Sequence, residues 1–255
     1  MYQLTNVKVI RSERTILDID ELSIDPHALT VVLGHNGSGK STLVNLLANQ
    51  FSPEEGEVTL ANKPLSAYGA KELAQTVAYL PQKLPEVAGL NVAELVRLGR
   101  FPWRGALGRW RKEDDEIIHN AMCETGVEEF KDILADQLSG GERQRTWVAM
   151  LLAQQADLLI LDEPTSALDI QHQYQLMQLL SELNKRTGKG VIVILHDLNL
   201  ALRYATHILA LKAGKIAFTG EVDVLLDEKL LSDLYSTPVQ LIDHPELDHK
   251  VAVVC

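Results

Sequence analysis

The chain has 255 residues, 46% of them hydrophobic, and a formal net charge of −11 at pH 7. This length is enough to bury a full core, as one large domain or two small ones, and the acidic balance argues against a surface that binds nucleic acid throughout. No apolar run approaches the roughly 20 residues that cross a bilayer, and the first residues lack the basic and apolar regions of a signal peptide, so we expect a cytosolic protein.

The pattern of apolar residues in the N-terminal third of the sequence predicts several strands and one helix. Apolar residues alternate or cluster over 2–10 and 15–24 on either side of a polar segment, which predicts a hairpin or small antiparallel sheet. A strand over 29–33 is followed by a helix with apolar residues at helical spacing. Short strands are expected over 56–61 and 76–82, the second stopped by a proline.

The pattern changes to helices over 84–153, where apolar residues recur at helical spacing near 92–98, 117–122 and 148–152. Cys123 falls in the second of these helices and is expected to be a small, buried, reduced side chain. Strand and helix then alternate, with strands over 158–161, 191–195 and 208–211, a helix through 176–183 and a short helix after 197. This alternation predicts a mainly parallel sheet covered on both faces, with the helical block inserted into one α/β core. The end of the chain predicts a hairpin across 213–215, a helix near 224–235 and a weakly patterned tail.

A glycine-rich turn joins the strand over 29–33 to its helix. Residues 34–41 fit the pattern G-x-x-x-x-G-K-[ST] of a phosphate-binding loop. Its glycines let successive backbone N–H groups face a phosphate, and the helix N-terminus adds partial positive charge. Lys40 would reach the β- and γ-phosphates, and Ser41 would bind Mg²⁺. A dinucleotide-binding turn would instead need glycine at Thr42. The candidate nucleotide-binding residues are Gly34, His35, Asn36, Gly37, Ser38, Gly39, Lys40, Ser41 and Thr42.

Two adjacent acids, Asp162 and Glu163, follow the apolar strand over 158–161. In a nucleotide-binding fold the first acid holds Mg²⁺, and the second can accept a proton from an attacking water. A strand that leaves the core also commonly ends in a charge. The phosphate loop in the same α/β core is what favours the functional interpretation.

A second candidate phosphate site opens the third predicted helix of the insertion. Ser139 and Glu142 have the spacing of a capping box, which accounts for a well-capped helix and nothing more. Gly140 and Gly141 are not needed for that cap. Because they have no side chains, they leave the backbone N–H groups at the helix N-terminus accessible to an anion. Two phosphate sites in one chain suggest that two copies share each nucleotide.

Taken together, these elements resemble an ATP-binding cassette (ABC) transporter ATPase over most of the chain. The matching elements, in the family's order, are the phosphate loop, Gln82 at the Q-loop, the signature over 138–142, the acids Asp162 and Glu163, the D-loop ending at Asp169, and His196 at the switch. The stretch 98–109 is similar to ATPase subunits of iron-siderophore importers, most closely the ferric-hydroxamate type. The resemblance implies an α/β phosphate-loop NTPase core with an antiparallel β subdomain over 1–85 and 154–220, a helical signature subdomain over 86–153, and a C-terminal helix and tail over 221–255.

The resemblance also implies roles for these residues. Two copies would form a head-to-tail dimer on two ATP molecules with Mg²⁺, in which Ser139, Gly140, Gly141 and Glu142 of one copy face the nucleotide of the other. Glu163 is the expected general base, with His196 at the γ-phosphate, and Ser41, Gln82 and Asp162 around Mg²⁺. The family's adenine-stacking aromatic aligns with Arg11. A guanidinium plane can stack on a base, and a solvated hairpin arginine accounts for this residue equally well.

The expected function is ATP hydrolysis that powers ferric siderophore uptake through an integral membrane permease, with a siderophore-binding protein as an indirect partner and no nucleic acid. The chain would be peripheral, on the cytoplasmic face of the bacterial inner membrane. Alternatives are import of another iron chelate, haem or cobalamin, an ABC ATPase that acts on nucleic acid, a small-molecule kinase, or a nucleotide-dependent clamp without catalysis.

One segment allows three interpretations. Residues 97–111 are a nucleic-acid stacking patch, a solvated face whose aromatics complete the helical core, or a docking surface for a permease beside the anionic leaflet. Glycines within it favour a loop, and Trp together with Arg is typical of interface hot spots, so docking is favoured. The residues concerned are Arg97, Arg100, Phe101, Trp103, Arg104, Arg109, Trp110 and Arg111.

Overall fold

A computed structural model describes residues 1–105, 108–244 and 250–255. These residues form two compact units, one of residues 1–67 with 181–255 and the other of residues 68–180. Helix α7 (Ile170–Thr187) belongs to both units, because it runs across their boundary in the sequence. No helix among the described ranges is long and apolar enough to span a membrane.

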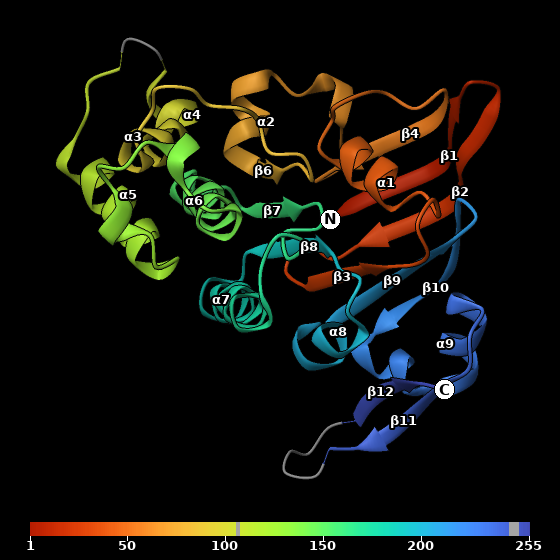
Figure 1. The fold of residues 1–255 in the computed structure, drawn as a ribbon. Coiled ribbons are helices and arrows are strands. Elements are labelled where there is room, and N and C mark those ends of the chain that lie inside the picture. Colours follow the sequence, from red (N-terminus) through yellow and green to blue (C-terminus); the bar gives the residue numbers. More distant parts are fainter. Residues whose placement is uncertain (106–107, 245–249) are drawn as a thin grey trace. The chain divides into compact units, whose positions relative to one another are not determined.

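The first unit contains an antiparallel sheet in the order β2-β1-β4-β5 (Figure 1). Its strands are β1 (Tyr2–Arg11), β2 (Arg14–Ile24), β4 (Glu55–Leu60) and the short β5 (Lys63–Pro64). Buried residues alternate along β1 on either side of an irregularity at Thr5 and Asn6, as expected for a sheet with one covered face. The Tyr2 hydroxyl donates to the Leu47 carbonyl oxygen at 2.7 Å, which ties this sheet to helix α1 (Lys40–Leu47). The predicted hairpin is confirmed.

A second set of strands in this unit carries the phosphate loop. Strand β3 (Leu29–Leu33) pairs in parallel with β8 (Gly190–Ile194) on one side and β9 (His207–Lys212) on the other. β10 (Lys215–Glu221) continues antiparallel from β9. All residues of β3 and β8 are buried, which matches their largely apolar sequences, with Thr30 as the one polar residue of β3. Helix α8 (Leu198–Tyr204) follows β8.

The C-terminal part of this unit differs from the prediction. The single helix expected near 224–235 is a 3₁₀ turn (Val222–Leu226) followed by α9 (Glu228–Tyr235), because Asp227 caps α9 by accepting from the backbone N–H groups of Lys229 and Leu230. The weakly patterned tail is an antiparallel pair, β11 (Val239–Asp243) with β12 (Lys250–Val254). Little of this pair is buried, so its sequence shows no clear alternation.

The second unit contains a parallel strand pair and a helical group. β6 (Val77–Leu80) pairs with β7 (Leu158–Leu161), and α2 (Ala70–Thr76), which the sequence does not predict, precedes β6. The helical group consists of α3 (Val92–Arg97), α4 (Phe101–Arg104), α5 (Lys112–Glu124) and α6 (Gly140–Ala153), with 3₁₀ turns at Leu98–Arg100, Glu128–Phe130 and Ala135–Gln137. The 3₁₀ turn Leu65–Ala67 belongs to the first unit and lies at the end of its segment 1–67. The parallel pairings confirm the α/β class.

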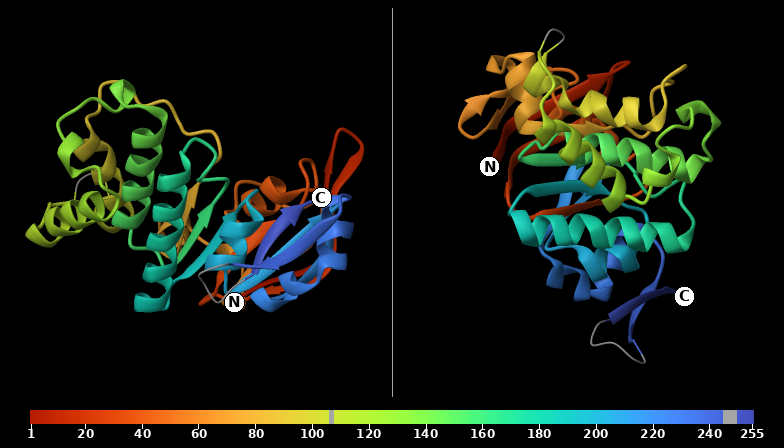
Figure 2. Two further views of the ribbon diagram at one scale, coloured as in Figure 1. Left: turned by 60° about the horizontal axis from the view of Figure 1, so that its bottom comes forward. Right: turned by 90° about the vertical axis from the view of Figure 1, so that its left-hand side faces the viewer.

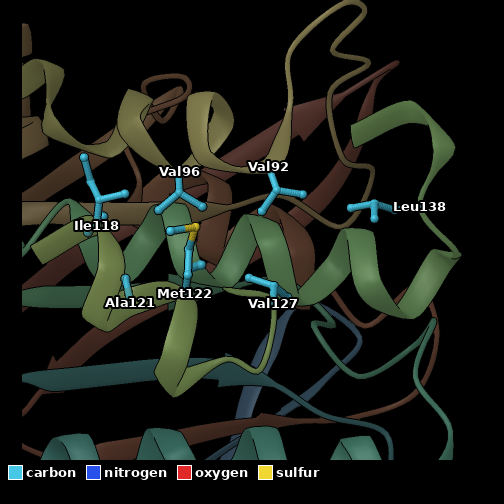
Figure 3. Close-up of a cluster of buried hydrophobic side chains, with 9 residues drawn as sticks. Val92, Val96, Ile118, Ala121, Met122, Val127 and Leu138 are labelled. Atoms are coloured by element: carbon cyan, nitrogen blue, oxygen red, sulfur yellow. The ribbon is translucent and has the colours of Figure 1, made fainter. Parts of the chain in front are cut away.

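The helical group has a hydrophobic core of its own. Val92 and Val96 of α3 point toward Ile118, Ala121 and Met122 of α5, and small residues of α6 complete the cluster (Figure 3). Figure 2 shows α3, α5 and α6 grouped together from two further directions.

The helical group corrects two expectations from the sequence. Cys123 is exposed, because its side chain lies on the outer face of α5, near His119. The segment expected to be a loop near its glycines is helical over 98–104, and Ala106 and Leu107 lie outside the described residues.

Candidate functional site

The phosphate loop lies between β3 and α1, where close backbone contacts require glycine. Gly34 has φ +144°, and a Cβ atom built there would lie 2.2 Å from the Leu211 carbonyl oxygen, so any other residue would collide with β9. Gly39 has φ +103°, and its added Cβ would lie 2.7 Å from Leu17 Cδ2 of strand β2. The loop is therefore held between two neighbouring strands, and Leu17 is a supporting residue that the motif does not reveal.

Lys40 is the buried cation of this loop. Its ammonium group donates to the carbonyl oxygens of Gly34 and His35, both at 2.8 Å, so it reaches back across the loop. Ser38 is also buried, and its hydroxyl has no hydrogen-bond partner among the described residues. A buried cation beside an unsatisfied hydroxyl fits a phosphate ligand, whose oxygens can accept from both.

The predicted switch residue His196 follows strand β8 and is exposed. The next residue, Asp197, caps helix α8 by accepting from the N–H groups of Asn199 at 2.7 Å and Leu200 at 3.3 Å. The turn that carries His196 is therefore fixed at its C-terminal side by a helix cap.

In the second unit the structure brings Gln82 and Glu163 together. The Gln82 side-chain amide donates to Glu163 Oε2 at 2.7 Å. Glu163 has φ +51°, in the left-handed region that is unfavourable for a side-chain-bearing residue. Asp162 is buried, and its backbone N–H donates to the Leu80 carbonyl oxygen at 2.9 Å. Thus both acids lie at the carboxyl end of β7, and the strained residue is the one expected to act on water.

The predicted capping box at the signature is confirmed. The Ser139 N–H donates to Glu142 Oε2 at 2.8 Å, and the Glu142 N–H donates to Ser139 Oγ at 3.4 Å. The hydrogen bond from the Ser139 backbone lowers the pKa of Glu142, so this carboxylate stays charged. Ser139 and Gly140 are exposed at the N-terminus of α6, where an anion would be favoured.

The D-loop packs against the signature within the same unit. A Cβ atom added at Gly141 would lie 3.5 Å from Leu168 Cδ2, so the two segments lie close to one another with space for a methyl group between them. Asp169 Oδ1 accepts from the backbone N–H of His172 at 2.9 Å and lies 2.8 Å from its Nδ1. The backbone hydrogen bond and the His172 ring lower the pKa of Asp169. Sequence reasoning misses His172, because a histidine three residues after an acid is not distinctive.

Arg11 has partners of its own at the end of the first hairpin. Its guanidinium forms an ion pair with Glu54 at 2.5 Å and lies 4.5 Å from the centroid of the Phe51 ring. These contacts account for an arginine at this position without a nucleotide. Stacking of Arg11 on adenine stays a prediction.

The candidate Mg²⁺ ligands have suitable chemistry. Ser41, Gln82 and Asp162 offer a hydroxyl, an amide and a carboxylate oxygen, which are the hard donors that Mg²⁺ prefers. Ser41 belongs to the first unit and the other two to the second.

A parallel strand that leads through a glycine-rich loop into a helix, with an acid at the end of another parallel strand, defines a phosphate-loop nucleotide-binding protein. The sequence model of the ABC transporter family matches residues 17–166, and the chain belongs to this family.

Known proteins similar to this chain agree with that assignment. It is 43% identical over 216 residues to the ferric enterobactin transport ATP-binding protein of Escherichia coli, covering 85% of this chain and 80% of that protein. It is 36% identical over 241 residues to the iron(3+)-hydroxamate import ATP-binding protein of Bacillus subtilis, covering 94% and 90%. A solved dimeric ATP-binding cassette in a post-hydrolysis state, bound to ADP and Pi, is 31% identical with a TM-score of 0.78, covering 87% of this chain and 99% of that one. The predicted family and fold class are confirmed.

Proposed function

We propose that this chain is the ATP-hydrolysing subunit of a membrane importer and powers uptake of a ferric siderophore, of the hydroxamate type, through a partner permease. The observation that carries the proposal is the Gln82–Glu163 pair at the end of β7, in a chain whose phosphate loop holds a buried lysine. Relatives that transport ferric enterobactin and iron(3+)-hydroxamate support the substrate class.

Each site residue then has a chemical task. Lys40, the unsatisfied Ser38 hydroxyl and the loop N–H groups bind the phosphates, and Gly34, His35, Asn36, Gly37, Gly39 and Thr42 shape that loop. Ser41, Gln82 and Asp162 would hold Mg²⁺, which supplies charge neutralisation on the transferred phosphoryl group. Glu163 accepts the proton of the attacking water, while the Gln82 amide orients its carboxylate. His196 lies at the γ-phosphate.

Hydrolysis in this proposal needs a second copy of the chain. Ser139 and Gly141 at the exposed helix N-terminus, with Gly140 between them, would contact the γ-phosphate held by the partner copy, beside Asp169 of the D-loop, while the charged Glu142 holds this N-terminus as its cap. The dimeric cassette among the similar structures supports this arrangement. The chain would divide into the core, helical and C-terminal parts set out above.

The permease would dock on the segment 97–111, at the cytoplasmic face of the membrane. Phe101, Trp103 and Trp110 are exposed by 46%, 40% and 41% of their surfaces, an unusual concentration of aromatic surface. The arginines divide into two kinds. Arg100 and Arg104 form ion pairs with the buried carboxylate of Asp114, so these two arginines stabilise the packed helical group. Arg109 and Arg111 are exposed.

The test is to purify the chain with the permease encoded beside it, in lipid, and to measure ATP hydrolysis with its siderophore-binding protein and one ferric complex at a time. Stimulation by a ferric hydroxamate supports the proposal. Stimulation only by a ferric catecholate, haem or cobalamin would contradict the hydroxamate assignment and identify that compound as the transported substrate. Lack of ATP hydrolysis in any complex would contradict the enzymatic role.

A further inference from the structure

The last residue of helix α9 touches the phosphate loop. The ring of Tyr235 meets the ring of His35 edge to face, with centroids 5.7 Å apart and planes at 69°. Burial, with the nearby charge of Asp197, raises the pKa of Tyr235 to about 12. The Tyr235 ring therefore contacts His35 of the phosphate loop, and its phenol lies within the electrostatic influence of Asp197, the residue that follows His196.

The strand pair β11–β12 is attached to the helix that follows the switch. The Asn199 side chain donates to the Ala252 carbonyl oxygen at 3.3 Å and accepts from the Ala252 N–H at 2.8 Å. The Asn199 backbone N–H in turn donates to Asp197. A paired amide contact of this kind fixes both the position and the direction of β12 relative to the start of α8.

Helix α9 and the strand pair are also bonded to each other. The Leu241 N–H donates to Glu228 Oε1 at 2.6 Å, and the Val239 N–H donates to Ser232 Oγ at 2.9 Å. Leu231 and Leu234 of α9 are buried. Lys212 of β9 donates to the Asp233 carbonyl oxygen. Figure 1 shows α9, β11 and β12 gathered beside α8 and the end of β9. Helix α9 and strands β11 and β12 therefore form one connected piece, residues 228–243 and 250–254, here called the C-terminal brace.

We infer that the C-terminal brace positions the two nucleotide-binding elements of its unit, with Tyr235 as the positioning residue for the phosphate loop and Asn199 as the positioning residue for the switch His196. This inference rests on the proposed roles of Lys40 and His196. Neither Tyr235 nor Asn199 is among the proposed nucleotide-binding residues. Tyr235 acts through His35, and Asn199 acts through the cap at Asp197.

The two contacts have separable effects. Loss of the Tyr235 ring releases His35 from its neighbour and loosens the loop that binds the phosphates, so ATP binding weakens. An edge-to-face pair is worth an affinity change of about 3- to 10-fold. Loss of the Asn199 amide releases the start of α8, so His196 is misplaced during the reaction while the phosphate loop is intact. If the whole contribution of the two hydrogen bonds is lost in the transition state, kcat falls by about 5- to 150-fold.

The experiment compares variants of the full chain by ATP titration calorimetry, steady-state ATP hydrolysis and thermal unfolding. Tyr235→Ala should raise Kd and KM for ATP with kcat retained, and Tyr235→Phe should restore both, because the ring alone makes the contact with His35. Asn199→Ala should lower kcat with KM retained, and Asn199→Asp, which keeps only the acceptor, should fall between it and the unsubstituted chain. Lys250→Ala removes an exposed ion pair with Asp243 in the same strand pair and should change neither constant.

Each other outcome overturns the inference. If Tyr235→Ala and Asn199→Ala leave KM and kcat unchanged, the brace does not position the site. If both variants change KM and kcat in the same proportion as they lower the unfolding temperature, the contacts are structural only. Lys40→Ala is measured alongside: if that variant binds and hydrolyses ATP normally, the proposed role of the phosphate loop fails instead, independently of the brace.

Discussion

The Gln82 amide lies 2.7 Å from Glu163 Oε2, which joins the end of β6 to the end of β7 through a carboxylate on a strained backbone. Glu163→Gln keeps the size of this side chain but removes its capacity to accept a proton. Hydrolysis should fall by about 10²–10⁴-fold, while calorimetry should show ATP binding unchanged and gel filtration should show an ATP-dependent dimer. A variant that hydrolyses ATP normally and stays monomeric at saturating ATP would contradict the assignment of Glu163 as base.

Ser139 should act on the nucleotide of the partner copy. Ser139→Arg fills the exposed helix N-terminus and should abolish ATP-driven dimerisation, measured by light scattering in the Glu163→Gln background. The matched control is Ser139→Ala, which removes only the cap and should cost about 1 kcal/mol of stability. Mixing Ser139→Arg with Lys40→Ala subunits should form some dimers with one site whose two halves are intact. If Ser139→Arg dimerises with ATP as well as the unsubstituted chain, the shared-site arrangement is wrong.

Asp114 should make stability depend on acid pH. Burial tends to raise the pKa of Asp114, but hydrogen bonds from Arg104, Arg100 and the Arg111 backbone outweigh it, so the pKa falls below its ordinary value of 3.8. The stabilisation is therefore present above pH 3.8 and is lost as the pH falls through the lowered pKa.

Arg104→Ala leaves this buried carboxylate with one guanidinium and should lower the free energy of unfolding at pH 7 by about 3–5 kcal/mol. Urea unfolding at pH 7 and in acid measures both effects. Lys131→Ala breaks an exposed pair with Glu128 and should change stability by less than about 1 kcal/mol. Equal effects of the two variants would contradict the structural role of the Asp114 cluster.

The docking surface is best tested at residues outside that cluster. Phe101→Ser together with Trp110→Ser removes two exposed aromatics, and at Trp110 it also removes the ring on which the Arg97 guanidinium stacks at 4.5 Å. The isolated subunit should keep its unfolding temperature and its basal ATP hydrolysis. Co-purification with the permease and transport in vesicles should be abolished. Retained transport would rule out docking here, and a large drop in unfolding temperature would favour a role of these aromatics in the core.

The elements that sequence analysis places well are those whose signal is local. The loop before Lys40 and the acids after β7 follow from short patterns with a fixed chemical purpose. Helix α2 escapes prediction because it has no buried residue, so it has no apolar face to recognise. The expectation for Cys123 is wrong because helical spacing does not say which neighbour covers a given face. The contact of Tyr235 with His35 joins residues 200 positions apart, and no local pattern can reveal it.

Helix α6 is held at its far end by the segment proposed to meet the permease. Arg100 Nη1 donates to the Ala153 carbonyl oxygen at 2.8 Å, and the Trp103 indole N–H donates to the Gln154 carbonyl oxygen at 2.6 Å. Gly99 lies so close that a Cβ atom there would be 2.2 Å from the Met150 carbonyl oxygen. The helix has 14 residues, a length of about 21 Å, and Ser139 stands at its other end. If the permease docks on this segment, as proposed, a displacement of Arg100 and Trp103 would be transmitted along α6 to its N-terminus, and would therefore move Ser139.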